Sequence, residues 1–151
     1  MADEPPRDPD VDLGVPAQRR ELERTPARVL GAISLGGALG GAARYGLTVL
    51  LPQPPGGFPL AVFLINVSGC LLIGVLMAAL PFLPALARPF LGVGFLGGYT
   101  TFSTYVMDVH RAEAAHTALL ALLATPLAAL PAVWLGAAAT RALLPRGGAV
   151  R

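Results

Sequence analysis

The chain has 151 residues, of which 54% are hydrophobic and 13% charged, a composition typical of a single membrane-embedded domain. Its net charge of +2 does not indicate nucleic-acid binding, because all 11 basic residues are arginines, most of them flank apolar segments, and the sequence has no basic surface interleaved with aromatic residues. The single cysteine, Cys70, excludes an intrachain disulfide and is interpreted as a small buried packing residue.

Residues 1–27 form a polar N-terminal segment. They include seven acidic residues, five prolines and four arginines with almost no apolar pattern, so they cannot bury enough surface to fold alone. Their mixed charges, without a short apolar core and cleavage site, argue against a secretory signal peptide. We therefore predict a disordered cytoplasmic tail over 1–27 and a short basic tail over 145–151.

Four apolar segments follow the tail, each long enough for a helix that crosses a hydrocarbon core of about 30 Å, which takes roughly 20 residues. They are Arg28–Leu51, Phe58–Leu80, Pro89–Met107 and Thr117–Thr140. Because the links between them are short, we expect an all-α membrane domain over 28–144 with sequential helices as antiparallel neighbours.

The arginines predict the orientation of the chain in the membrane. With four spans both chain ends lie on the same side, and that side holds nine arginines. The opposite side holds only Arg111, if Arg44 within the first span is left aside. This is a strong positive-inside signal, so both termini of this multi-pass cell-membrane protein are predicted to be cytoplasmic.

The first span is rich in glycine and contains one charge. Gly36 with Gly40, and Gly37 with Gly41, form two overlapping small-xxx-small pairs, which favour close helix packing in lipid. An arginine within a span is costly unless it faces protein, water or the interface. Arg44 therefore either extends to the outer interface or lines an aqueous vestibule, where it would raise the local anion concentration.

The second span is apolar except for Asn66 and Ser68. An asparagine in mid-membrane must form hydrogen bonds, and the simplest interpretation is a contact between helices that contributes about 1 kcal/mol. Its amide can also donate to a passing anion, which a carboxylate cannot do. Asn66 is therefore a candidate either for packing or for an ion path.

Residues 92–105 of the third span, GVGFLGGYTTFSTY, carry glycines, hydroxyls and aromatic rings where a plain membrane helix has leucines. Each of Gly97 and Gly98 costs roughly 1 kcal/mol relative to alanine in a helix, which predicts a break between Gly97 and Thr101. In a membrane, broken backbone is tolerated only where it is buried in protein or lines a polar cavity.

Past this break, Phe102 and Tyr105 share a helix face, and Thr101, Ser103 and Thr104 supply hydroxyls. The two rings either form an aromatic core pair or turn their positive edges toward an anion. We interpret this segment as the wall of a small polar path.

The fourth span contains two prolines, Pro126 and Pro131, each of which removes a backbone donor and favours a kink. Trp134 is interpreted as an interfacial or packing residue. The sequence has no nucleophile beside a base and no cluster of metal-binding histidines or cysteines, so we do not expect an enzyme.

Motifs in three spans resemble the Fluc (CrcB) family of fluoride channels. The run GFLGGYTTFSTY is similar to the third-helix signature GFxGGxTTFSTF of that family. The first span matches the pattern GGxxGAxxRY at Gly36, Gly37, Gly40, Arg44 and Tyr45. The second span matches GTFxVNxxGSFLxG at Asn66, Gly69 and Gly74. The resemblance is close over spans one to three and weak over span four.

The chain departs from the family pattern at several positions. Ala61 and Val62 stand where Gly-Thr is usual, and Tyr105 replaces the second phenylalanine. In the fourth span, Ala121 falls on the position of a tyrosine and Thr125 on that of a serine. The polar track of the fourth helix is therefore thinner than in the family.

The resemblance implies an antiparallel dimer with a broken third helix and two pores, through which fluoride leaves the cytoplasm passively. Fluoride is small and strongly hydrated, so the pore must replace its water with hydrogen-bond donors. The expected donors are Asn66, Thr104, Tyr105, Thr125 and the ring edge of Phe102.

The resemblance also implies a structural sodium ion (Na+) at the dimer centre, bound by backbone carbonyls near Gly97 and Thr100. Carbonyls that a helix break frees are suitable hard ligands for such a cation. Asp108 falls on a position that is often acidic in the family, at the channel mouth, although a solvated helix end explains it equally well.

The arginine bias leads to a hypothesis about the partner. An antiparallel homodimer needs the chain to insert in both orientations, whereas this chain is strongly biased, so we expect a homologous partner with the opposite bias and one degenerate pore.

Two other functions are considered, a small-solute exporter and a structural subunit. A proton-coupled small-solute exporter would normally have a mid-membrane carboxylate, which no span contains, and a structural subunit would not conduct.

Overall fold

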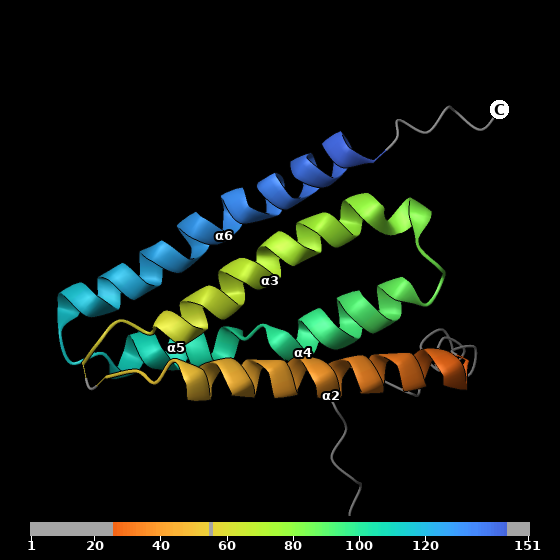
Figure 1. Cartoon of the computed structure of the whole chain (residues 1–151). Coiled ribbons are helices and arrows are strands. Elements are labelled where there is room, and N and C mark those ends of the chain that lie inside the picture. The colour runs from red at the N-terminus through yellow and green to blue at the C-terminus, as the bar shows by residue number, and fades with distance from the viewer. Residues whose placement is uncertain (1–25, 55, 145–151) are drawn as a thin grey trace, which may run out of the picture.

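The computed structural model describes residues 26–54 and 56–144, and every regular element in these two ranges is helical. The predicted tail at 1–27, except its last two residues, and the predicted tail at 145–151 lie outside the described residues. The helices form four antiparallel spans, as Figure 1 shows by colour, which confirms the all-α prediction.

Three spans are continuous and one is divided. The continuous ones are α2 (Ala27–Leu50), α3 (Leu60–Ala79), which continues into the 3₁₀ turn η1 (Leu80–Phe82), and α6 (Ala115–Leu143). The third span consists of the π-helix η2 (Arg88–Leu96), the single turn α4 (Gly97–Tyr99) and α5 (Phe102–Arg111). Its helix runs four residues past the predicted end, because hydropathy marks the apolar stretch whereas the backbone remains helical until Ala112 becomes extended.

Two stretches of the described chain are long and apolar enough to cross a membrane, Leu60–Phe82 and Ala115–Leu143. The other two spans are less apolar or less continuous. Helix α2 is 24 residues long but carries six glycines and two arginines, and the third span is divided. Hydropathy within the described residues therefore marks two of the four helical spans as able to cross a membrane.

The spans pack as two pairs that are not sequential. Helix α3 lies along α6, and α2 lies along η2 and α4, whereas α2 and α3 scarcely touch (Figure 1). The prediction that sequential helices are close neighbours is therefore wrong for α2 and α3, although their antiparallel direction is correct. Short links make sequential helices antiparallel, but the shapes of the helix surfaces decide which helices pack against each other.

Glycines at the contact explain the pairing of α2 with the third span. A Cβ atom at Gly36 would collide with the Phe90 carbonyl oxygen, and one at Gly40 with the Phe95 carbonyl oxygen. A Cβ atom at Gly41, by contrast, would meet no atom within 4 Å. Of the two predicted pairs, Gly36 with Gly40 therefore has both members at this interface. Gly37 also lies at it, because a Cβ atom at Gly98 would collide with the Gly37 carbonyl oxygen, whereas Gly41 does not.

A reciprocal glycine contact joins α3 to α6. A Cβ atom at Gly74 would collide with the Val133 carbonyl oxygen, and one at Gly136 with that of Leu71. The two backbones therefore approach as closely as small residues allow, which is how helices gain van der Waals contact in lipid. This pair forms one wall of the pocket described below.

Candidate functional site

The third span breaks at two extended residues. Helix α4 ends at Tyr99, and Thr100 and Thr101 follow with ψ angles of 159° and 123° before α5 starts at Phe102. The Thr101 hydroxyl accepts a hydrogen bond from the Thr104 amide at 3.2 Å, so Thr101 is the N-cap of α5. The Thr100 hydroxyl donates to the Leu96 carbonyl at 2.9 Å, which closes the end of α4.

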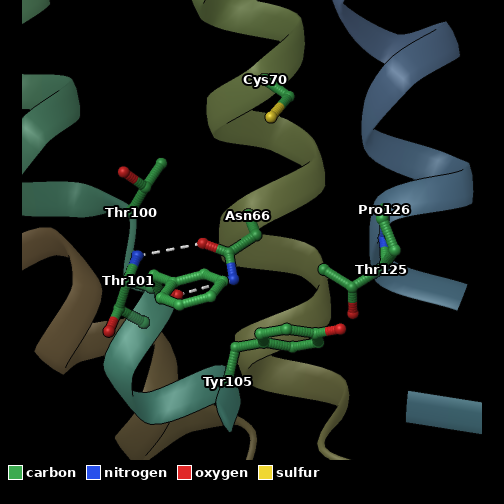
Figure 2. Close-up of a pocket in the computed structure, with 8 residues that line it drawn as sticks. Asn66, Cys70, Thr100, Thr101, Tyr105, Thr125 and Pro126 are labelled. Atoms are coloured by element: carbon green, nitrogen blue, oxygen red, sulfur yellow. Dashed lines mark hydrogen bonds between the residues drawn. The ribbon is translucent and has the colours of Figure 1, made fainter. Parts of the chain in front are cut away.

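Asn66 satisfies the backbone at this break. Its side-chain amide donates to the Thr101 carbonyl at 2.9 Å, and its side-chain oxygen accepts from the Thr101 amide at 3.0 Å (Figure 2). One side chain of α3 thus pairs both backbone groups of an extended residue. Because a carboxamide nitrogen carries two hydrogens, the second N–H of Asn66 remains after these bonds are made.

Gly69 lets α3 approach the break. A Cβ atom at Gly69 would collide with the Thr100 methyl group, so the third span could not come this close to α3 with a larger residue there. One residue before Gly69, Ser68 also contacts the third span, through Tyr99. Since the Ser68 hydroxyl donates to the Ile65 carbonyl at 3.2 Å, the Tyr99 hydroxyl must be the donor in its 2.9 Å bond to Ser68.

A pocket of about 360 Å³ opens at the break, between α3, α5 and α6 (Figure 2). It brings together four of the five residues predicted for an ion path, namely Asn66, Phe102, Tyr105 and Thr125. The remaining lining residues are Cys70, Thr100, Thr101 and Pro126. The sequence analysis places Thr101 in the wall of the polar path and Thr100 at the expected sodium site. It assigns no ion contact to Cys70 or Pro126, although Cys70 lies one helical turn after Asn66 and Pro126 directly follows Thr125.

Two other predicted residues lie outside this pocket. Thr104 is exposed on α5, and its hydroxyl accepts from the Thr101 hydroxyl at 3.0 Å. Arg44 is half-buried on α2, the helix that packs along η2 and α4. The pocket also corrects the interpretation of Cys70, which is half-buried and lines the pocket instead of filling a core.

The two predicted ring positions are adjacent but differ in environment. The Phe102 and Tyr105 ring centroids lie 5.9 Å apart with the rings tilted by 44°. Tyr105 is only 9% exposed and its hydroxyl donates to the Leu122 carbonyl at 2.7 Å, whereas Phe102 is 77% exposed. The Tyr105 hydroxyl is therefore bonded to α6, and the ring is what this residue presents to the pocket.

The break leaves two carbonyl oxygens without their usual helical donors. In a continuous helix the Thr101 amide would bond to the Gly97 carbonyl, but it bonds to Asn66. The Thr104 amide would likewise bond to the Thr100 carbonyl, but it bonds to the Thr101 hydroxyl. Both oxygens are neutral and hard, so their chemistry fits a cation such as sodium.

Asp108 lies one residue beyond the predicted third span and is half-buried. Its Oδ2 atom is buried and has no hydrogen-bond partner among the described residues. Burial raises the pKa of the Asp108 carboxyl above its ordinary value of 3.8, and the Arg111 guanidinium opposes this effect only in part. The folded chain therefore binds a proton here more tightly than the unfolded chain does.

We expect the stability contribution of Asp108 to be largest below pH 3.8 and to be lost as the pH rises through the folded-state pKa, because ionisation is disfavoured only in the folded state. Asp108→Asn should therefore raise the apparent Tm at neutral pH and flatten its decline with rising pH. Thermal unfolding in detergent across a pH series measures both. Glu113→Gln, which removes an exposed carboxylate nearby, is the control, and an equal response of both variants would contradict this assignment.

The sequence of this chain is similar to one protein family and to several individual proteins. Residues 31–137 match the family described as CrcB-like protein, Camphor Resistance (CrcB). The chain is 50% identical over 134 residues to fluoride-specific ion channel FluC 1 of Streptomyces coelicolor, covering 85% of this chain and 87% of the relative. It is 47% identical over 124 residues to FluC 2 of Streptomyces avermitilis, covering 78% of each chain. FluC 3 of the same organism is 49% identical over 86 residues, or 55% of this chain and 42% of the relative.

Proposed function

This chain belongs to the CrcB-like protein family, a family of membrane ion channels rather than of enzymes, and from this premise we propose that it is a subunit of a passive fluoride channel. The observation that carries the proposal is the pocket at the break of the third span. It gathers an amide, two aromatic rings and hydroxyls from three helices, and none of its eight lining residues is a carboxylate. Export down the fluoride gradient would then need no bound proton carrier.

The pocket retains donors that the fold does not use. The second N–H of Asn66 is one, because only one is needed for Thr101. The Thr125 hydroxyl is another, since it is buried and forms no side-chain hydrogen bond within the described part of the chain. The positive ring edges of Phe102 and Tyr105 complete a set that can replace the water around a small anion.

Thr104 and Arg44 are assigned supporting roles outside the pocket. Thr104 lies next to Thr101 in a chain of hydroxyls, 3.0 Å from it, and would continue the polar path toward the exposed surface. The cationic Arg44 would raise the anion concentration in a vestibule. Sodium is assigned to the carbonyls of Gly97 and Thr100, where its charge would compensate two oxygens that lack helical donors.

One chain presents only part of a closed path, which supports assembly as an antiparallel dimer. Phe102 is 77% exposed, and Ser103 and Thr104 beside it are exposed as well. The arginine bias favours cytoplasmic termini for this chain, so an oppositely oriented copy would have to insert against that bias. The partner is therefore a homologous chain of opposite bias. Relatives numbered FluC 2 and FluC 3 in one organism support such pairs.

Fluoride efflux from liposomes tests this function. We expect little efflux from vesicles with this chain alone, and rapid, chloride-excluding efflux when an oppositely biased homologue is added, as followed with a fluoride electrode. Rapid efflux from the single chain would retain the channel function and refute the obligate heterodimer. Absence of fluoride efflux in both preparations, with correctly folded protein, would refute the channel function.

A structural, non-conducting subunit is the second candidate, because Asn66 and Tyr105 both use polar groups to satisfy backbone within this chain. Thr125→Val in this subunit distinguishes the two, since it removes an unused hydroxyl at nearly constant volume. We expect at least a tenfold loss of efflux, equivalent to about 1.4 kcal/mol, if the hydroxyl contacts the ion. Thr140→Val, whose hydroxyl bonds to Gly136 within α6, is the matched control, and unchanged flux in Thr125→Val would favour the structural subunit.

A further inference from the structure

Pro126 leaves one backbone oxygen of α6 without its helical donor. Helix α6 continues through Pro126, and in an α-helix the amide of residue 126 would bond to the Leu122 carbonyl. Proline has no N–H, so this bond cannot form. In a membrane no lipid group can replace it, and an unpaired carbonyl there is unfavourable.

The donor that reaches this oxygen comes from another span. The Tyr105 hydroxyl donates to the Leu122 carbonyl at 2.7 Å, across 17 residues of sequence. Figure 2 shows Tyr105 extending from α5 toward the part of α6 that carries Thr125 and Pro126. A phenol provides both the length to span the two helices and the single donor that the carbonyl lacks, whereas a phenylalanine provides only the ring.

We propose that Tyr105 and Pro126 act as a coupled pair, in which the phenol O–H takes the place of the amide hydrogen that proline lacks. Tyr105 is then a positioning residue. Its hydroxyl fixes α5 against α6 and holds the ring edge at the pocket, and it is not free to donate to an ion. The pair requires no conduction, so it can be tested whether or not the proposed channel function holds.

The same helix contains a matched control. Pro131 also lacks an N–H and leaves the Leu127 carbonyl without its helical donor, but no side chain bonds to that oxygen within residues 26–54 and 56–144. Leu127 is also 67% exposed. The two prolines are therefore chemically alike, but only Pro126 is paired with Tyr105.

A double-mutant cycle tests the pair. In detergent, Tyr105→Phe should lower the apparent Tm by about 4 °C, because the Leu122 carbonyl loses its donor. In the Pro126→Ala background, where an alanine amide can bond to Leu122, the loss should fall by at least half. In the Pro131→Ala background it should stay at its original size. An equal loss in all three backgrounds would overturn the proposal.

A spectroscopic measurement keeps the proposal testable if Tyr105→Phe does not fold. The Cζ carbon of each tyrosine, labelled with ¹³C, reports the hydrogen bond of its hydroxyl in solid-state NMR spectra of the full chain in lipid. The Tyr105 resonance is assigned by elimination with Tyr45→Phe and Tyr99→Phe. We expect Pro126→Ala to move it and Pro131→Ala to leave it in place, and a resonance that Pro126→Ala leaves unmoved would refute the coupling.

Discussion

Gly40→Ala is expected to destabilise the chain strongly, whereas Gly41→Ala, one residue away, is not. The added methyl group at position 40 would collide with the Phe95 carbonyl oxygen, and it would lie 2.9 Å from the Phe95 carbonyl carbon and the Tyr99 amide nitrogen. These are backbone atoms of the third span, which cannot rotate away as a side chain can. Overpacking a tight contact costs about 1–3 kcal/mol, and forcing two backbones apart should reach the upper end of that range.

The two variants differ in the sign of their effect. At Gly41 the new methyl group meets no atom within 4 Å, so the gain in helix propensity of up to about 1 kcal/mol should remain. The apparent Tm in detergent and the monodisperse fraction on size exclusion measure both effects. Gly31→Ala, also in open space, is a second control. If Gly40→Ala were as stable as Gly41→Ala, the assignment of Gly36 and Gly40 to this interface would be wrong.

Asn66→Leu should abolish fluoride efflux and also lower stability. The substitution leaves the Thr101 amide and carbonyl without partners at the break, and each unsatisfied group costs about 1–3 kcal/mol. It also removes the unused N–H from the pocket. We expect efflux from the reconstituted channel to fall to the level of empty vesicles.

Ser68→Ala provides the comparison for Asn66→Leu. It removes a polar group two residues away on α3 and breaks one hydrogen bond to Tyr99, but it leaves the backbone at the break paired. It also removes the bond from the Ser68 hydroxyl to the Ile65 carbonyl, so its cost should be about 1–2 kcal/mol, at about 1 kcal/mol for each hydrogen bond, with efflux largely retained. If Asn66→Leu left both efflux and Tm unchanged, neither the pairing of Thr101 nor a pore role for Asn66 would be tenable.

The number and direction of the spans could be predicted from the sequence, because the apolar segments are separated by short polar or proline-bounded links. The choice of neighbours could not. Gly36 and Gly41 look alike in the sequence, and only the surface of the third span decides which of them is in contact. Helix pairing in lipid depends on such complementary shapes, which local composition does not encode.

The candidate site was predictable in its members but not in its hydrogen bonds. Asn66 could be selected because an asparagine is unusual in an apolar span, and the two rings because they share a helix face past the expected break. Thr125 could be selected only through the resemblance, which aligns it with a family serine. The bonds of Asn66 depend on the extended backbone at Thr100 and Thr101, which lies just past the Gly97-Gly98 pair on which the prediction rested. The partner of Tyr105 could have been predicted in part from the sequence. A proline at position 126 has no N–H, so within a helix it leaves the Leu122 carbonyl without its backbone donor.

The two hydrogen bonds between the Asn66 side chain and the Thr101 backbone limit which helices can be exchanged between homologous chains. The extended backbone in the third span is paired by a side chain of the second, so the two spans depend on each other although a loop and a 3₁₀ turn separate them. A chimera that combined this third span with a second span lacking the Asn66 amide would leave the Thr101 amide and carbonyl without hydrogen-bond partners. Exchange of α3 and the third span together would transfer both partners of these bonds.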